Sequence, residues 1–139
     1  MTDTLTFTIN SDGFSLADLR RIWTQPIEVR GDDHMMQGVI QSRQTIEQVA
    51  ASDETVYGGN TGFGLLANVK IAKDELDTLQ RNLVISHAVG VGEPIDADTT
   101  RLIMALKAMS LSQGVSGIHP NTLKLLLNMI NHEIYPIIP

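Results

Sequence analysis

The chain has 139 residues, of which 42% are hydrophobic, 19% charged and 4% aromatic, so it can bury a core and that core is expected to be aliphatic. Ten Lys and Arg against 16 Asp and Glu give a net charge of −6, which argues against nucleic acid or an anionic membrane as the main partner. The chain has no cysteine, which excludes disulfides and thiolate chemistry, and no membrane-spanning run or secretory signal is visible, which favours a cytoplasmic location.

The first third of the chain predicts one short strand and two helices. Residues 5–10 alternate and are rich in β-branched side chains, as in a strand. Ser15 fits the N-cap of a helix, with Asp18 as the acidic partner of a capping box. A second helix is predicted from Asp32 and Asp33 to about Ala51, although its apolar pattern is loose.

A glycine-rich stretch follows, at residues 52–72. Four glycines fall within seven residues, which is too many for a helix interior and predicts a structured loop. Tyr57 stands at the edge of the four glycines. Its phenol could act as an acid or base only with a pKa well below the reference of about 10. Spacing alone leaves open the alternative that Tyr57 and Phe63 anchor the loop on the core.

Three helices are predicted in the rest of the chain. The first covers Asp74 to about Val89 and carries His87 near its apolar face. The second is capped by Asp96 and runs to Gln113, with apolar residues around most of its circumference, as in a helix buried in something larger. The third begins near Pro120, a good first helical residue. The apolar end at residues 134–139 indicates that the natural chain continues or that a partner covers it.

The predicted fold is therefore mainly α, with short N-terminal strand(s), about five helices and the glycine-rich loop at 52–72. We expect residues 1–139 to be the N-terminal portion of a larger helical-bundle enzyme, without an internal domain boundary.

Several familiar motifs fail in this sequence. Residues 62–67 match G-x-G-x-x-A but lack the preceding strand of a dinucleotide site, and no Lys-Ser/Thr follows the glycines as in a P-loop. Residues 113–117 lack half of a nucleophile elbow and favour a helix end and turn. The four histidines show no metal-ligand spacing, so no metal is expected. From its position alone, His87 is more often a hydrogen-bonded core residue than a catalyst.

Taken together, the chain resembles the N-terminal part of the aromatic amino acid ammonia-lyases, closest to the histidine-specific members. The specific string is Y-G-x-N-T-G-F-G at 57–64, in which Gly59 replaces the larger residue usual in the family. Order and spacing hold from about Phe14 to Pro139. The supporting matches are LQRNLVISHAVG at 79–90, GEP at 92–94, Arg101, GVSG at 114–117 and YPIIP at 135–139.

The resemblance implies the elimination of ammonia from an α-amino acid in a homotetrameric enzyme. Its electrophile is methylidene-imidazolone (MIO), which forms from an internal Ala-Ser-Gly. The resemblance implies that Tyr57 is the catalytic base and that Ser86 and His87 bind the substrate side chain, a pair that suits the imidazole of L-histidine, with urocanate as product. The loop-positioning residues that it implies are Gly58, Asn60, Thr61, Gly62, Phe63 and Gly64.

One element of the family's chemistry is missing from these 139 residues. They contain no Ala-Ser-Gly, and the nearest string is Val115-Ser116-Gly117. In the family the tripeptide comes shortly after the residues that match 135–139. We therefore expect a chain that stops before its electrophile, holds no cofactor and is inactive alone. The alternatives are a naturally short, non-catalytic helical module that binds a partner, or a fragment of a tyrosine or phenylalanine ammonia-lyase or aminomutase.

Overall fold

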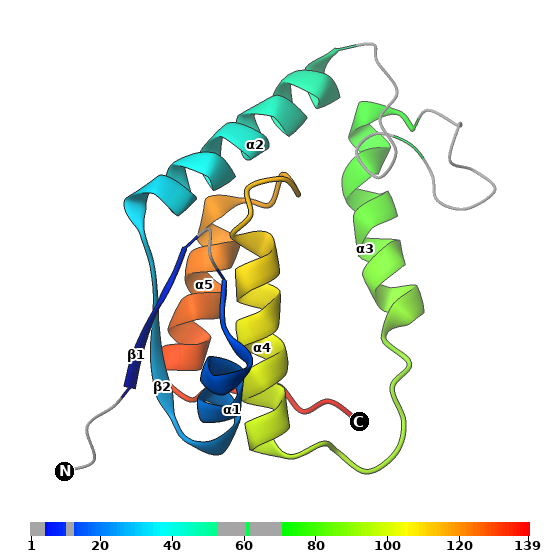
Figure 1. The fold of residues 1–139 in the computed structure, drawn as a ribbon. Helices are drawn as coiled ribbons and strands as arrows, with labels where there is room; N and C mark the ends of the chain where they lie inside the picture. The colour runs from blue at the N-terminus through cyan, green and yellow to red at the C-terminus, as the bar shows by residue number, and fades with distance from the viewer. Residues whose placement is uncertain (1–4, 11–12, 53–60, 62–70) are drawn as a thin grey trace. The chain divides into compact units, whose positions relative to one another are not determined.

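A computed structural model describes residues 5–10, 13–52, 61 and 71–139 (Figure 1). Five α-helices, two strands and a short 3-10 helix occur among these residues, so the mainly α fold class is confirmed. In chain order the elements are β1 (Leu5–Ile9), α1 (Leu16–Thr24), β2 (Ile27–Gly31), α2 (Asp33–Ala51), η2 (Lys73–Glu75), α3 (Leu76–His87), α4 (Ala97–Leu111) and α5 (Pro120–Asn131).

The chain divides into two compact units. The larger unit comprises Met1–Arg43 and Gly92–Pro139, and the smaller unit comprises Gln44–Val91. The helix α2 begins in the larger unit and ends in the smaller one. The larger unit holds both strands and the helices α1, α4 and α5, whereas the smaller unit holds α3.

The two strands of the larger unit form a parallel pair. Leu5 pairs with Ile27 at one end of the register and Ile9 with Gly31 at the other, and α1 forms the crossover between the strands. Alternate residues of each strand are buried, as the pleat requires. The strand predicted at 5–10 is confirmed as β1. Its partner β2, which begins directly after Pro26, was not located by the sequence analysis.

Helices α4 and α5 pack against each other, α1 packs on α4, and α5 packs on β2 (Figure 1). Apolar side chains from all of these elements and from the start of α2 meet in one core, and Phe7 is its only aromatic member among the described residues, so the expected aliphatic core is confirmed. The buried members are Phe7, Ile9, Ile22, Ile27, Val29, Met35, Val39, Met104, Ala105, Ala108, Leu123, Leu127 and Ile130.

Only one face of α4 is fully buried, and Ile103 on another face is 44% exposed. The prediction that α4 runs to Gln113 was wrong, because the helix ends at Leu111. The Ser112 hydroxyl and backbone N–H both donate to the Ala108 carbonyl there. Gly114 then takes a φ of +67°, and a Cβ on it would lie 2.7 Å from the Gly38 carbonyl carbon. Glycine is therefore required where the end of α4 approaches α2.

The outer edge of β2 is paired by a side chain. Asn131, at the end of α5, accepts a hydrogen bond from the Val29 N–H (2.7 Å) and donates one to the Val29 carbonyl (3.0 Å). Its amide thus takes the place of a neighbouring strand at this residue. Because an unpaired edge exposes backbone groups that invite other chains, this contact also closes the edge locally.

Replacing Asn131 by Asp is expected to lower the free energy of unfolding by about 1–3 kcal/mol. The carboxylate still accepts from the Val29 N–H, but it cannot donate and it places a negative charge beside the Val29 carbonyl. Urea denaturation followed by circular dichroism measures the loss. The matched control is Asn128→Asp, the same change at an exposed position of the same helix. Equal effects of the two substitutions would contradict this role.

Two predicted helix caps are confirmed. The Ser15 hydroxyl accepts from the Asp18 N–H (3.2 Å) and the Asp18 carboxylate accepts from the Ser15 N–H (3.0 Å), which completes a capping box on α1. The Asp96 carboxylate accepts from the Thr99 N–H (2.7 Å) at the start of α4. The bonds from Ser15 hold the pKa of Asp18 below its ordinary value of 3.8, and those from Thr99 do the same for Asp96.

Acid is expected to destabilise the chain through these two caps. A carboxyl whose pKa is lower in the folded state than in the unfolded state contributes stability above the unfolded value, and loses it as the pH falls through the folded value. The loss is therefore expected below a pH of about 4. Asp96→Asn keeps a capping acceptor, so the variant should lose less stability on acidification, as urea midpoints along a pH series measure. An unchanged acid dependence in Asp96→Asn would show that Asp96 contributes nothing to it.

Candidate functional site

The described part of the candidate site lies at the end of α3. This helix has a half-buried stripe of Leu76, Leu79 and Leu83 and no fully buried residue. The sequence predicted that this helix runs to about Val89, but it ends at His87, because Ala88 takes the non-helical angles φ −81° and ψ 65°.

Ser86 and His87 are both exposed at this helix end. The Ser86 hydroxyl lies 2.9 Å from the Leu83 carbonyl oxygen, and His87 Nδ1 lies 2.8 Å from the same oxygen. Ser86 Oγ and His87 Nδ1 are 3.1 Å apart. The ring of His87 is hydrogen-bonded, as in the commoner case for a lone histidine, but it is exposed rather than part of the core. Its role in substrate binding stays a prediction.

Most of the loop positions nominated from the sequence lie outside the described residues. These are Tyr57, Gly58, Asn60, Gly62, Phe63 and Gly64. Thr61 is described and is only 1% exposed, although it carries a hydroxyl. The roles of Thr61, Tyr57 and their neighbours in the glycine-rich stretch remain predictions.

Residues 114–117 form the turn that the sequence analysis favoured over a nucleophile elbow. Gly114 and Gly117 both have positive φ, of +67° and +65°, and the Gly117 N–H donates to the Ser42 hydroxyl at 2.9 Å. Ser116 is exposed. Among residues 5–10, 13–52, 61 and 71–139, no group of three or more His, Asp or Glu side chains could hold a metal ion.

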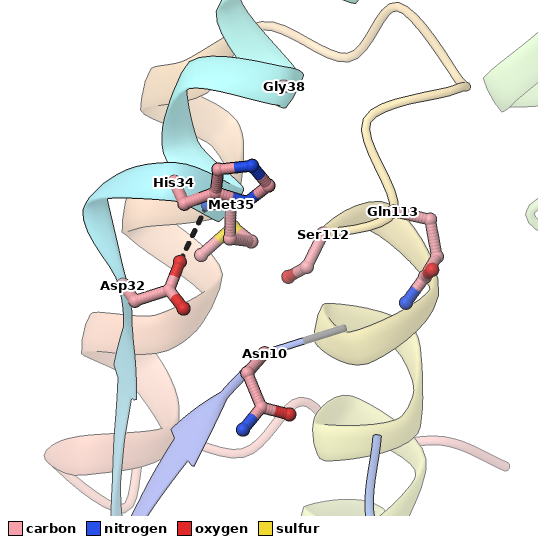
Figure 2. A pocket seen from close by; sticks show the side chains of 7 residues that line it. All are labelled: Asn10, Asp32, His34, Met35, Gly38, Ser112 and Gln113. Atoms are coloured by element: carbon pink, nitrogen blue, oxygen red, sulfur yellow. Dashed lines mark hydrogen bonds between the residues drawn. The ribbon is translucent and has the colours of Figure 1, made fainter. Parts of the chain in front are cut away.

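A small pocket of about 220 Å³ opens in the larger unit, where the strands end and α2 begins (Figure 2). It is lined by Asn10, Asp32, His34, Met35, Gly38, Ser112 and Gln113. The Asp32 carboxylate accepts a hydrogen bond from the Met35 N–H at 2.6 Å and so caps the start of α2 (Figure 2). The pocket contains none of the residues nominated from the sequence, and it is smaller than most small-molecule sites.

The larger unit also contains a buried cation, Arg101. The sequence analysis named this residue only as one of those that support the family resemblance. The side chain of Arg101 is 3% exposed, and its Nε donates to the Ile22 carbonyl at 2.6 Å and its Nη2 to the Trp23 carbonyl at 2.5 Å. Nη2 also pairs with the Asp98 carboxylate at 2.9 Å. The guanidinium lies 5.9 Å from the ring centre of Tyr135. Arg101 therefore joins α1, α4 and the C-terminal segment, and its role is structural.

The chain belongs to the aromatic amino acid lyase family, whose sequence model matches residues 14–139. This bears out the resemblance found in the sequence. No helix of the described residues is both long enough and apolar enough to cross a membrane.

Among curated proteins, the chain is 45% identical to the histidine ammonia-lyase of Vibrio vulnificus (strain CMCP6) over 137 residues, which is 99% of this chain and 27% of that protein. It is 50% identical to the histidine ammonia-lyase of Pseudomonas fluorescens (strain SBW25) over 125 residues, or 90% of this chain and 24% of that protein. Among solved structures, the tyrosine aminomutase of Streptomyces globisporus matches with a TM-score of 0.90 and 28% identity, over 97% of this chain and 26% of that one. The chain thus spans about a quarter of the length of these relatives.

Proposed function

We propose that this chain is the N-terminal part of an enzyme that converts L-histidine to urocanate and ammonia. The observation that carries the proposal is the exposed Ser86-His87 pair at the end of α3, in a chain that is 45–50% identical to histidine ammonia-lyases. A hydroxyl and an imidazole that face solvent can hydrogen-bond the ring of histidine. Assembly as a homotetramer and a cytoplasmic location belong to the same proposal.

In the proposed reaction this chain contributes binding and proton transfer. Ser86 and His87 hold the substrate side chain, and Tyr57 accepts the proton from the substrate's Cβ. The Cβ–H and Cα–N bonds break, a Cα=Cβ double bond forms, and the amino group leaves as ammonia. The Cβ proton is weakly acidic, so the reaction needs a positioned base as well as an electrophile. The family's MIO supplies the electrophile, and this chain has no Ala-Ser-Gly from which to form it.

Two assays test the proposal. The purified chain, incubated with L-histidine, should form no urocanate above a no-protein control. A chimera in which this chain replaces the matching residues of the Vibrio vulnificus enzyme should restore the tripeptide and form urocanate. Urocanate from the isolated chain would overturn the inactivity, and a folded, MIO-containing chimera that is inert towards histidine would overturn the proposed substrate.

A second candidate is a lyase or aminomutase that acts on tyrosine. It is supported by the structural likeness to the Streptomyces globisporus tyrosine aminomutase, although the sequence identity is only 28%. The same chimera separates the two candidates, because its rates with histidine, tyrosine and phenylalanine can be compared directly. A preference for tyrosine would favour the aminomutase-like candidate. If the chimera lacks activity with every amino acid, a non-catalytic role for this chain gains support.

A further inference from the structure

The pocket of about 220 Å³ in the larger unit lies where three segments of the chain meet (Figure 2). Asn10 directly follows β1, Asp32 directly precedes α2, and Ser112 directly follows α4. All three segments belong to the larger unit, which is one compact body. The pocket contains none of the residues of the proposed reaction, so a binding site here goes beyond the proposed function.

The charge of this pocket is negative. The half-buried Asp32 carboxylate accepts from the Met35 N–H through Oδ1, and no described residue donates to its Oδ2. Asp33, the next residue, adds a second negative charge just outside the pocket. The N-terminus of α2 carries a partial positive charge of only about half a unit, so the two carboxylates outweigh it. None of the described lining residues is Lys or Arg. The pocket therefore favours a cation.

Ser112 gives the pocket an oxygen that can only accept a hydrogen bond. Its side chain is 6% exposed, and its hydroxyl donates its single hydrogen to the Ala108 carbonyl at 2.6 Å. Figure 2 shows the Ser112 oxygen and the Asp32 carboxylate on opposite sides of the pocket. The side-chain amides of Asn10 and Gln113 each carry one further oxygen at the same pocket. A ligand that lies between these oxygens must donate several hydrogen bonds.

We propose that this pocket binds a small primary alkylamine in its protonated form. An alkylammonium group carries one positive charge and three N–H donors. These match the Asp32 carboxylate, the Ser112 oxygen and a side-chain amide oxygen of the pocket wall. Hydrogen bonds between an ammonium and a carboxylate are about twice as strong as those between neutral groups, so Asp32 is the main anchor.

The rest of the wall suits a short carbon chain. Met35 contributes an apolar, nearly buried side chain, and Gly38 contributes none, which leaves space beside it. A Cβ on Gly38 would meet no atom within 4 Å. The volume is below the roughly 300–1,000 Å³ of pockets for drug-sized ligands, so only a few carbon atoms fit beside the ammonium group.

The first test is an NMR titration of the ¹⁵N-labelled 139-residue chain with ethylammonium chloride, at constant ionic strength. A pH of about 8 keeps an ordinary imidazole neutral and an alkylamine protonated. Saturable shifts are expected for the backbone amides of Met35, Gly38 and Gln113. Tetramethylammonium has the same charge but no N–H donor, so it should bind more weakly by about tenfold or more. Equal affinity for the two cations, or no saturable shift with ethylammonium, would overturn the proposal.

The second test replaces Asp32 by Asn. Asparagine is a good helix N-cap, so the variant keeps an acceptor for the Met35 N–H and loses only the charge. Its affinity for ethylammonium should fall by about tenfold or more. The matched control, Asp33→Asn, removes the same charge from an exposed residue that does not line the pocket, and should change the affinity by less than about threefold. Equal losses would indicate general attraction by the helix end and would overturn the proposal, as would an unchanged affinity in Asp32→Asn.

Discussion

Replacing Arg101 by Met is expected to lower the free energy of unfolding of the chain by about 2–4 kcal/mol, out of a total that is typically 5–15 kcal/mol. The substitution keeps the aliphatic volume but removes the donors to the Ile22 and Trp23 carbonyls. These carbonyls lie at the end of α1, where no further turn of helix supplies partners. Asp98 is 59% exposed and is solvated by water after the change, so the main loss comes from the two carbonyls.

A matched control separates burial from charge. Arg30 forms an ion pair with Glu28 at 2.8 Å, but its side chain is 63% exposed, and Arg30→Met should cost less than about 1 kcal/mol. Arg101→Lys should not rescue the chain, because one ammonium cannot reproduce the fork of a guanidinium in a buried position. Urea titrations of the three variants measure these losses. Similar midpoints for Arg101→Met and Arg30→Met would show that Arg101 is not a structural link.

The second large effect concerns Tyr57 and is expected in the chimera. Tyr57→Phe keeps the aromatic ring but removes the hydroxyl. If Tyr57 is the base, kcat should fall by about 10²–10⁴-fold with little change in KM, as for an interaction made mainly in the transition state. The MIO absorbance should persist, because the tripeptide belongs to the Vibrio vulnificus part of the chimera.

Tyr135→Phe is the matched control for this substitution. The Tyr135 hydroxyl is buried and has no hydrogen-bond partner among the described residues, so its loss should leave kcat nearly unchanged. If Tyr57→Phe is equally silent, Tyr57 is an anchor of the glycine-rich segment, which is the alternative that its spacing left open. The base would then have to be another residue, while the proposed role of Ser86 and His87 would be unaffected.

The local features of the fold were accessible from the sequence because they depend on residues that are neighbours along the chain. Ser15 and Asp96 cap helices through bonds to groups three residues away. Pro120 begins α5 as expected. The strand β2 was missed, although the alternation of Ile27 and Val29 with charged residues after Pro26 carried its signal. A segment of five residues between two helical patterns is short enough to be mistaken for a loop that connects the two helices.

The candidate site was predictable only in part. Ser86 and His87 are consecutive in the sequence, and the family resemblance supplied their proposed role. The orientation of their hydrogens was not predictable, since it depends on where α3 ends and on which carbonyl the imidazole meets. The non-helical backbone angles at Ala88 end α3 directly after His87, and residue types alone did not predict that end.

The sequence by itself determined the family, the mainly helical class, the helix caps and the absence of Ala-Ser-Gly from these residues. Only the tertiary structure decided which distant groups meet. Asn131 pairs with Val29, which is 102 positions away, and Arg101 reaches the Ile22 carbonyl over 79 positions. The physical reason is that capping bonds are set by residue type and short spacing, whereas these contacts depend on how helices and strands pack. A buried asparagine or arginine finds its partner only when that packing brings an unpaired backbone group within reach.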